Sequence, residues 1–147
     1  IAKYPHLAPQ DIAVWEMFIE NNPGFFNSVD YDVHVGQGRE YPVSDPPGVA
    51  EGMIHLSKLR IDVVGYRGSD AWVIEVKPTG HAGAFGQVEI CRELFRENSN
   101  AHFVVRGAVV CGRCFPDCHV VGARFGISCF HAGEKMNDTS SKEKGGA

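Results

Sequence analysis

The sequence has no long apolar run, no internal repeat and no excess of positive charge. None of its hydrophobic stretches approaches the roughly 20 residues of a membrane-spanning helix, so we expect no membrane segment. The net charge of −4 argues against tight non-specific binding to nucleic acid, although a local basic patch remains compatible with it. No secretion signal is visible, so the five cysteines are expected to be reduced thiols in a cytoplasmic protein, bacterial or viral.

The sequence also lacks the commonest complete metal motifs. Its histidines fit no H-x-E or H-E-x-x-H pattern, and Cys111 and Cys114 form a C-x-x-C pair without a second such pair. Because Cys118, Cys129 and His131 follow, a zinc or iron–sulfur module centred on this region is one hypothesis. However, Cys111 ends an apolar run and Cys118 lies in an expected helix, which is typical of cysteines that pack as small hydrophobes. We therefore expect neither zinc nor an iron–sulfur cluster.

What is present is a pattern of alternating helices and strands in a chain of 147 residues, 44% of them hydrophobic. Periodicity predicts helices over 9–21, 87–98 and about 116–126, and strands over 29–36, 53–66, 71–77, 101–111 and 127–132. The Gly- and Pro-rich segments 36–52 and 78–86 are expected to be loops. This order predicts an α/β domain over residues 1–133, with a central mixed sheet flanked by helices, followed by a polar, disordered tail over 134–147.

One predicted hairpin brings acidic residues together. Gly68 and Ser69 have the pattern of a two-residue type II′ turn, and the register that this turn imposes places Asp62 opposite Glu75. Lys77 then shares their face of the sheet, because side chains alternate along a strand. Facing carboxylates repel each other, and a divalent cation would remove that repulsion. The alternative is an ordinary solvated polar face.

These residues carry a resemblance to a known family. The order helix, three strands, helix, strand, with "RID" ending in Asp62 and "IEVK" carrying Glu75 and Lys77, resembles the PD-(D/E)XK nuclease superfamily, which has the restriction-endonuclease-like fold. The resemblance covers about residues 9 to 131. Glu16 matches the acidic residue that many members carry on the first helix, and Gln87 matches the glutamine of the RecB-like branch.

The sequence departs from the family pattern at two positions. Ile61 stands before Asp62 where the family has proline, and Cys91 stands where the Q-x-x-x-Y pattern of the RecB-like branch has tyrosine. The proline is not a ligand, so its absence leaves the site intact. The missing tyrosine weakens the link to that branch alone.

The resemblance implies a metal-dependent hydrolysis of phosphodiester bonds. Asp62, Glu75 and the backbone carbonyl of Val76 would hold Mg²⁺ or Mn²⁺, and Lys77 would position the attacking water or stabilise charge in the transition state. The products would carry 5′-phosphate and 3′-hydroxyl ends. The alternative role of Lys77 is that of a surface partner for Glu75, which would contribute at most about 1 kcal/mol.

Further residues are candidates for supporting roles. Glu16 would bind the metal through water or hold a second ion, and Gln87 would orient the metal-bound water or contact phosphate; each is otherwise an ordinary polar residue of a helix. Four basic residues are candidates for contacts with nucleic-acid phosphates, or else solvated side chains: Lys58, Arg60, His55 and His81. In the hairpin register Arg60 is expected opposite Lys77.

The function predicted from these observations is a DNA nuclease, endo- or exonucleolytic, dependent on Mg²⁺ or Mn²⁺. The alternative is a non-catalytic module that keeps the nuclease fold and binds nucleic acid or protein. The expected partner is DNA, in a homodimer or a larger nucleoprotein assembly, and no membrane is expected to be involved.

Overall fold

A computed structural model describes residues 3–38 and 59–136 of the chain. The elements follow one another in this order: α1 (Pro9–Asn21), β1 (Ser28–Val35), β2 (Leu59–Arg67), β3 (Asp70–Gly80), α3 (Ala82–Phe95), a π-helical turn η1 (Arg96–Asn100), β4 (Val104–Cys114), α4 (Pro116–Arg124) and β5 (Ile127–His131). In the described part of the chain, no helix is both long enough and apolar enough to cross a membrane.

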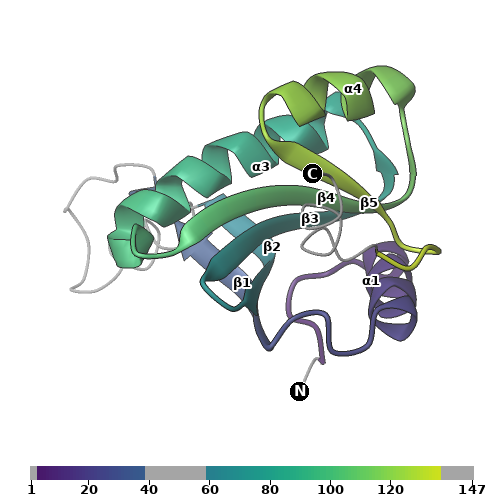
Figure 1. Ribbon diagram of the computed structural model, residues 1–147, viewed down its shortest axis with the longest axis horizontal. Helices are drawn as coiled ribbons and strands as arrows, with labels where there is room; N and C mark the ends of the chain where they lie inside the picture. The colour runs from purple at the N-terminus through teal and green to yellow at the C-terminus, as the bar shows by residue number, and fades with distance from the viewer. Residues whose placement is uncertain (1–2, 39–58, 137–147) are drawn as a thin grey trace, which may run out of the picture.

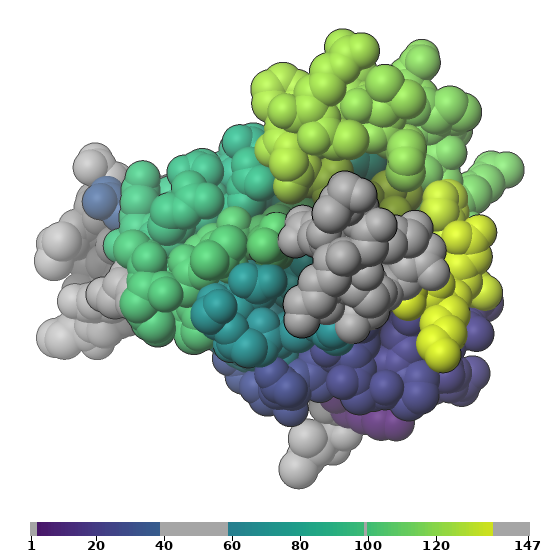
Figure 2. Space-filling model, in the orientation of Figure 1, coloured from purple at the N-terminus to yellow at the C-terminus, as the bar shows by residue number. Residues whose placement is uncertain are grey.

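The strands form one mixed five-stranded sheet in the order β1-β2-β3-β4-β5. β1 pairs with β2 and β2 with β3 in antiparallel orientation. β3 pairs with β4 and β4 with β5 in parallel orientation. The helices α3 and α4 connect the parallel strands and lie on one side of the sheet, and α1 lies on the other (Figure 1). The space-filling view shows the same arrangement, with α4 above and α1 below (Figure 2). The predicted fold class, an α/β domain with a central mixed sheet, is confirmed.

The two faces of the sheet build separate parts of the core. On the α1 face, Trp15 and Phe18 pack against residues of the central strands such as Val63 and Ile74, all of them fully buried. On the α3 face the buried residues come chiefly from β2, β3 and α3, and they include Val64, Val73, Cys91 and Phe95. Because β3 and β4 are covered on both faces, their sequences are nearly continuous apolar runs.

The first helix presents a different stripe from the one that its periodicity suggests. The spacing favours Ile12, Trp15, Phe18 and Ile19 as the buried positions, whereas the structure buries Asp11, Val14, Trp15 and Phe18. Both stripes share Trp15 and Phe18, and they differ in phase by less than one position. The consequence is that an acidic residue lies on the buried side of α1.

The predicted loop over 78–86 is wrong. Its first residues continue β3 to Gly80, and α3 begins at Ala82 instead of residue 87. The side chain of His81 caps this helix by accepting a hydrogen bond from the backbone N–H of Ala84, at 3.4 Å. The glycines that suggested a loop therefore occupy the first turns of a capped helix, where capping and tertiary packing outweigh their low helix propensity.

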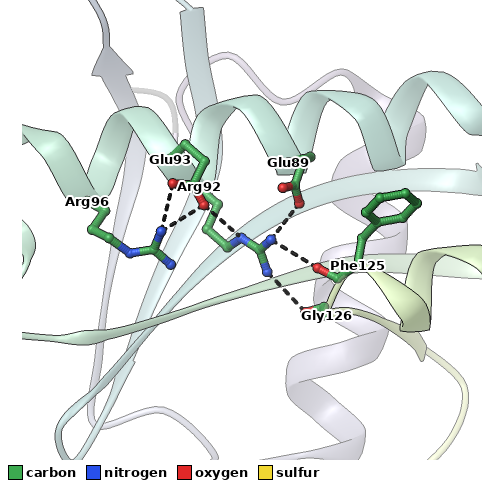
Figure 3. Close-up of polar contacts among 6 residues, drawn as sticks. All are labelled: Glu89, Arg92, Glu93, Arg96, Phe125 and Gly126. Carbon is green, nitrogen blue, oxygen red and sulfur yellow. Dashed lines mark hydrogen bonds and ion pairs between the residues drawn. The ribbon is translucent and has the colours of Figure 1, made fainter.

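Arg92 ties α3 to the end of α4. Its guanidinium donates hydrogen bonds to the carbonyl oxygens of Phe125 (3.0 Å) and Gly126 (3.2 Å), and pairs with Glu89 on its own helix at 2.5 Å (Figure 3). These carbonyls follow the last turn of α4, where backbone acceptors lack helical partners and a basic side chain is favourable. Arg92 thereby fixes how the last crossover packs on α3.

The last described residues are held against the end of α1. Asn22 donates from its side-chain amide to the carbonyl of Glu134 (3.2 Å) and accepts from the backbone N–H of Met136 (2.6 Å). Met136 also packs against the core on the α1 face. The remainder of the predicted tail, 137–147, lies outside the described residues, as does the 53–58 part of the predicted second strand.

Candidate active site

The hairpin of β2 and β3 has the predicted turn and register. Gly68 has a φ of +57°, as the first central residue of a type II′ turn requires. Arg67 pairs with Asp70, and the ladder continues outward as far as Val63 and Ile74. Beyond that pair β2 and β3 no longer form ladder pairs, whereas β3 continues to Gly80 in parallel pairing with β4.

Asp62 and Glu75 are the first residues past the end of this ladder. A carboxylate oxygen of Asp62 accepts a hydrogen bond from the backbone N–H of Val76 at 2.9 Å, in place of a strand-to-strand bond. Each carboxyl group also acts on the pKa of the other, so Asp62 and Glu75 lie close together. Because the N–H and C=O of a strand residue point to the same neighbour, the carbonyl of Val76 faces the same side as Asp62.

Both carboxyl groups are held in an environment that disfavours their charge. Glu75 is only 7% exposed, and its burial, followed by the charge of Asp62, raises its pKa to about 8. Burial likewise raises the pKa of Asp62, although the hydrogen bond from Val76 and the charge of Lys77 oppose this. Such paired, buried carboxyls are typical of sites that act on a ligand.

Lys77 lies between Glu75 and an acidic residue from α1. Its ammonium nitrogen is 3.7 Å from a carboxylate oxygen of Glu75 and 4.0 Å from one of Asp11. Asp11 is only 6% exposed, and its charge helps to raise the pKa values of Asp62 and Glu75, after larger contributions from burial. Asp11 was not among the residues predicted for the site. Its helical spacing from Trp15 and Phe18, which places it on the buried side of α1, was the signal that could have identified it.

Glu16 lies on a different side of α1 from Asp11. Five residues of helix separate the two, which turns their side chains well apart. Glu16 is half-buried, and its charge acts on Lys3, whose pKa is raised chiefly by Tyr4 and to a smaller extent by Glu16. Within the described residues, the acidic group that α1 places beside Lys77 is therefore Asp11, and the predicted role of Glu16 has no geometric support.

Gln87 occupies the second turn of α3 and is half-buried. Cys91, one turn later on the same stripe, is fully buried, and its pKa is raised to about 12 by burial and then by the charges of Glu75 and Asp62. This places the stripe of α3 that carries Gln87 and Cys91 on the same sheet face as the carboxylates. Gln87 therefore remains a candidate for this site.

Of the predicted phosphate-contacting residues, the two that the structure describes, Arg60 and His81, make their contacts elsewhere. Arg60 pairs with His34 of β1 and not with Lys77, because the β2–β3 ladder ends before it. Its guanidinium contacts His6 Nδ1 at 2.5 Å and lies 3.7 Å from a carboxylate oxygen of Asp32. His81 is exposed and caps α3. His55 and Lys58 lie outside the described residues.

The donor set fits a hard divalent cation. Asp62 and Glu75 are two adjoining carboxylates, and a backbone carbonyl faces the same side, which is an all-oxygen set of the kind that Mg²⁺ and Mn²⁺ prefer. The ammonium group of Lys77 contacts the carboxyl groups of Glu75 and Asp11, so within the described residues one positively charged group adjoins several carboxyl groups. Ionised carboxylates in such a buried place are costly without a further cation.

Two solved structures resemble this chain. The first, described as "Structure of EndoMS-dsDNA2 complex", has a TM-score of 0.48 and 19% identity, and the match covers 88% of this chain and 47% of that chain. The second, a repair endonuclease from Pyrococcus abyssi, has a TM-score of 0.48 and 17% identity, with 92% and 50% covered. The chain thus spans about half the length of each. No protein-family model matches the sequence, and the comparison with curated proteins finds no match.

Proposed function

We propose that this domain is a metal-dependent nuclease of the PD-(D/E)XK type that hydrolyses DNA phosphodiester bonds. The observation that carries the proposal is the carboxyl pair of half-buried Asp62 and buried Glu75, with Lys77 beside it, at the point where the pairing of β2 with β3 ends. Asp62, Glu75 and the carbonyl of Val76 would hold Mg²⁺ or Mn²⁺. When bound, the ion supplies an activated water and neutralises charge on the phosphoryl oxygens.

Lys77 contributes a fixed positive charge to this site. Its contacts with Glu75 and Asp11 hold the ammonium group beside the carboxylates and limit its rotamers. A charge that is already oriented stabilises the negative charge that develops on the attacked phosphate without a cost of reorganisation. The same group orients the attacking water by hydrogen bonding. Gln87, on the adjoining stripe of α3, is proposed to orient that water or contact phosphate.

The test is a cleavage assay with Mn²⁺ on plasmid, linear duplex and single-stranded DNA. Lys77→Ala should lower turnover by about 10²–10³ while the protein still binds the metal, because both carboxylates remain. Glu75→Gln should lose metal binding and cleavage together. Lys135→Ala, which removes an exposed lysine far along the chain, is the matched control and should cleave like the wild type.

Two results would overturn the catalytic proposal. One is a wild-type protein that cleaves none of these substrates at micromolar concentration, and the other is a Lys77→Ala variant as active as the wild type. DNA binding without cleavage would favour the non-catalytic module instead. The end groups of the products give a further check, since the proposal requires 5′-phosphate and 3′-hydroxyl ends.

A further inference from the structure

Three of the five cysteines gather on the last part of β4 and on β5. Cys111 and Cys114 lie on the last part of β4, and Cys129 lies on β5. Their sulfur atoms are all within 4.8 Å of one another, and the sulfurs of Cys111 and Cys129 are 3.3 Å apart. Strand pairing explains the approach, because Cys111 is paired with His131 and Cys129 is two residues earlier on the same face.

Two imidazoles adjoin the same sulfur cluster. The ring nitrogens of His119 on α4 and His131 on β5 form a second group with the sulfur of Cys129, again within 4.8 Å of one another. The two ring centroids are 6.3 Å apart. Cys129 is thus shared between a group of three thiols and a pair of imidazoles. Thiolates and imidazoles together are the ligands that select zinc over magnesium or manganese.

We infer that Cys111, Cys114 and Cys129 bind a structural Zn²⁺ ion, with an imidazole of His119 or His131 as the fourth ligand. A tetrahedral zinc centre with Zn–S bonds of about 2.3 Å places its sulfurs about 3.8 Å apart, close to the spacing found here. In a [4Fe–4S] cluster each thiolate binds a different iron atom, so the sulfurs stand further apart, and a [2Fe–2S] cluster with cysteine ligands needs four thiolates where this group has three. The geometry therefore favours a single ion.

The remaining two cysteines, Cys91 and Cys118, do not belong to the group of three thiols. Cys91 is fully buried in the core on the α3 face, with no other thiol in its cluster. Cys118 follows Cys114 in the sequence and would be chosen from spacing, yet it lines the cavity between α3 and α4 with Val121 and Phe125. The thiols of Cys91 and Cys118 thus lie outside the group of three, although Cys118 packs against the same apolar cluster as Cys111, Cys114 and Cys129.

The spacing of the cysteines in the sequence led us to expect no zinc, whereas their positions in the fold favour a zinc site. Spacing shows a single C-x-x-C pair, and the partner of that pair, Cys129, comes fifteen residues after Cys114 by way of α4. Only the parallel pairing of β4 with β5 brings it beside Cys111. A zinc ion at this place would join the ends of β4 and β5 through side chains, and would also join α4 if His119 is the fourth ligand.

The zinc site would also support the neighbouring strand. Cys111 is paired with Lys77 of β3, and a Cβ atom on Gly80 would lie 3.1 Å from the sulfur of Cys114 and 3.4 Å from that of Cys111. β3 therefore approaches the thiols closely just after the residues of the proposed active site. The inference does not depend on the proposed nuclease activity, because the zinc ligands and the carboxylates are separate groups.

Zinc content per chain tests the inference directly. The 147-residue chain is incubated with Zn²⁺ under reducing conditions and freed of excess metal. Its bound zinc is then measured by inductively coupled plasma mass spectrometry. We expect about one zinc per chain in the wild type and in Cys118→Ser, and little in Cys114→Ser or Cys129→Ser. His119→Ala and His131→Ala identify the fourth ligand, since one of them should weaken zinc binding and the other should not.

Cobalt substitution gives a second readout that does not need folded variants. Co²⁺ in the wild-type site should show intense thiolate-to-metal charge-transfer absorption, and stepwise modification of thiols with a mercurial should release the metal. A wild type that binds no zinc after reduction, several iron atoms per chain, or equal zinc in folded Cys129→Ser and wild type would overturn the inference. The inference would also be overturned if Cys111 and Cys129 form a disulfide that resists mild reductants and prevents zinc from binding.

Discussion

At the scale of single residues, the site depends on where a few charges lie relative to the end of a strand pair. The Gly68–Ser69 turn fixes the register of the hairpin as far as Val63 and Ile74, so Asp62 and Glu75 both follow the end of the ladder, and this much follows from sequence. The buried position of Asp11 does not follow from spacing alone. It depends on the phase in which α1 packs on the sheet, which the apolar residues of the helix leave ambiguous.

Substitutions of Asp11 and Glu16 should have different effects on cleavage. Asp11→Asn removes a charge that holds the ammonium of Lys77, so cleavage of plasmid DNA should fall by about 10-fold or more. Glu16→Gln removes a carboxylate from the same helix on another side, and cleavage should stay within about twofold of the wild type. Kinetics at saturating Mn²⁺ measure both. A larger loss in Glu16→Gln than in Asp11→Asn would restore the role first predicted for Glu16.

Glu75 should make the stability of the metal-free protein depend on pH. Its pKa is raised from 4.5 to about 8 in the folded state, so between these values the folded protein binds more protons than the unfolded chain. The free energy of unfolding should therefore decrease as pH rises from about 4.5 to 8, by at most about 1.4 kcal/mol per pH unit. Asp62, whose pKa is also raised, adds to the decrease in the same direction.

Urea denaturation across this pH range, in the presence of a chelator specific for hard cations, measures the effect. Glu75→Gln cannot ionise, so its stability should vary less with pH than that of the wild type. Equal slopes for the two proteins would show that Glu75 is not held in its protonated form, and would remove the electrostatic argument for a cation at this position.

At the scale of elements, the packing of α4 on α3 relies on Arg92 rather than on exposed ion pairs. The side chain of Arg92 is 11% exposed, whereas the pair of Arg96 with Glu93 is 41% and 50% exposed. Both pairs join residues three positions apart, but Arg92 pairs with Glu89 within α3, whereas Arg96 is the first residue of η1 (Figure 3). They differ in that Arg92 also donates to the backbone after α4.

Replacement of these two arginines should separate the two kinds of interaction. Arg92→Ala leaves the carbonyls of Phe125 and Gly126 without this donor, and it should lower the free energy of unfolding by about 1–3 kcal/mol. Arg96→Ala is the matched control, and it should cost no more than about 1 kcal/mol. Chemical denaturation of both variants decides the matter, and similar losses would mean that the bonds to the end of α4 contribute little.

The elements themselves show which sequence signals are reliable. The helix over 9–21 and the β2–β3 hairpin follow from strong local patterns, and the structure places them where these patterns predict. The start of α3 does not, because Gly83 and Gly86 imitate a loop and the cap from His81 is invisible in a periodicity pattern. Local patterns therefore predict elements well and their ends poorly.

At the scale of the whole molecule, the order of elements was enough to predict a mixed sheet with helices on both faces, and the structure confirms it. Non-local pairing was not predictable from spacing. The parallel pairing of β4 with β5 gathers the thiols, and the early end of the β2–β3 ladder removes Arg60 from the neighbourhood of Lys77. Features that depend on contacts between distant segments thus require the structure.

The central claim is that Asp62 and Glu75 form a binding site for a divalent cation, and calorimetric titration with Mn²⁺ tests it most directly. The wild type should bind Mn²⁺ near pH 7 and release protons as it does so, because Glu75 is largely protonated before the ion arrives. Titrations in two buffers with different ionisation enthalpies measure this release. Lys77→Ala should still bind, whereas Asp62→Asn and Glu75→Gln should not. Binding that is unchanged in the last two variants, or absent from the wild type, would contradict the account.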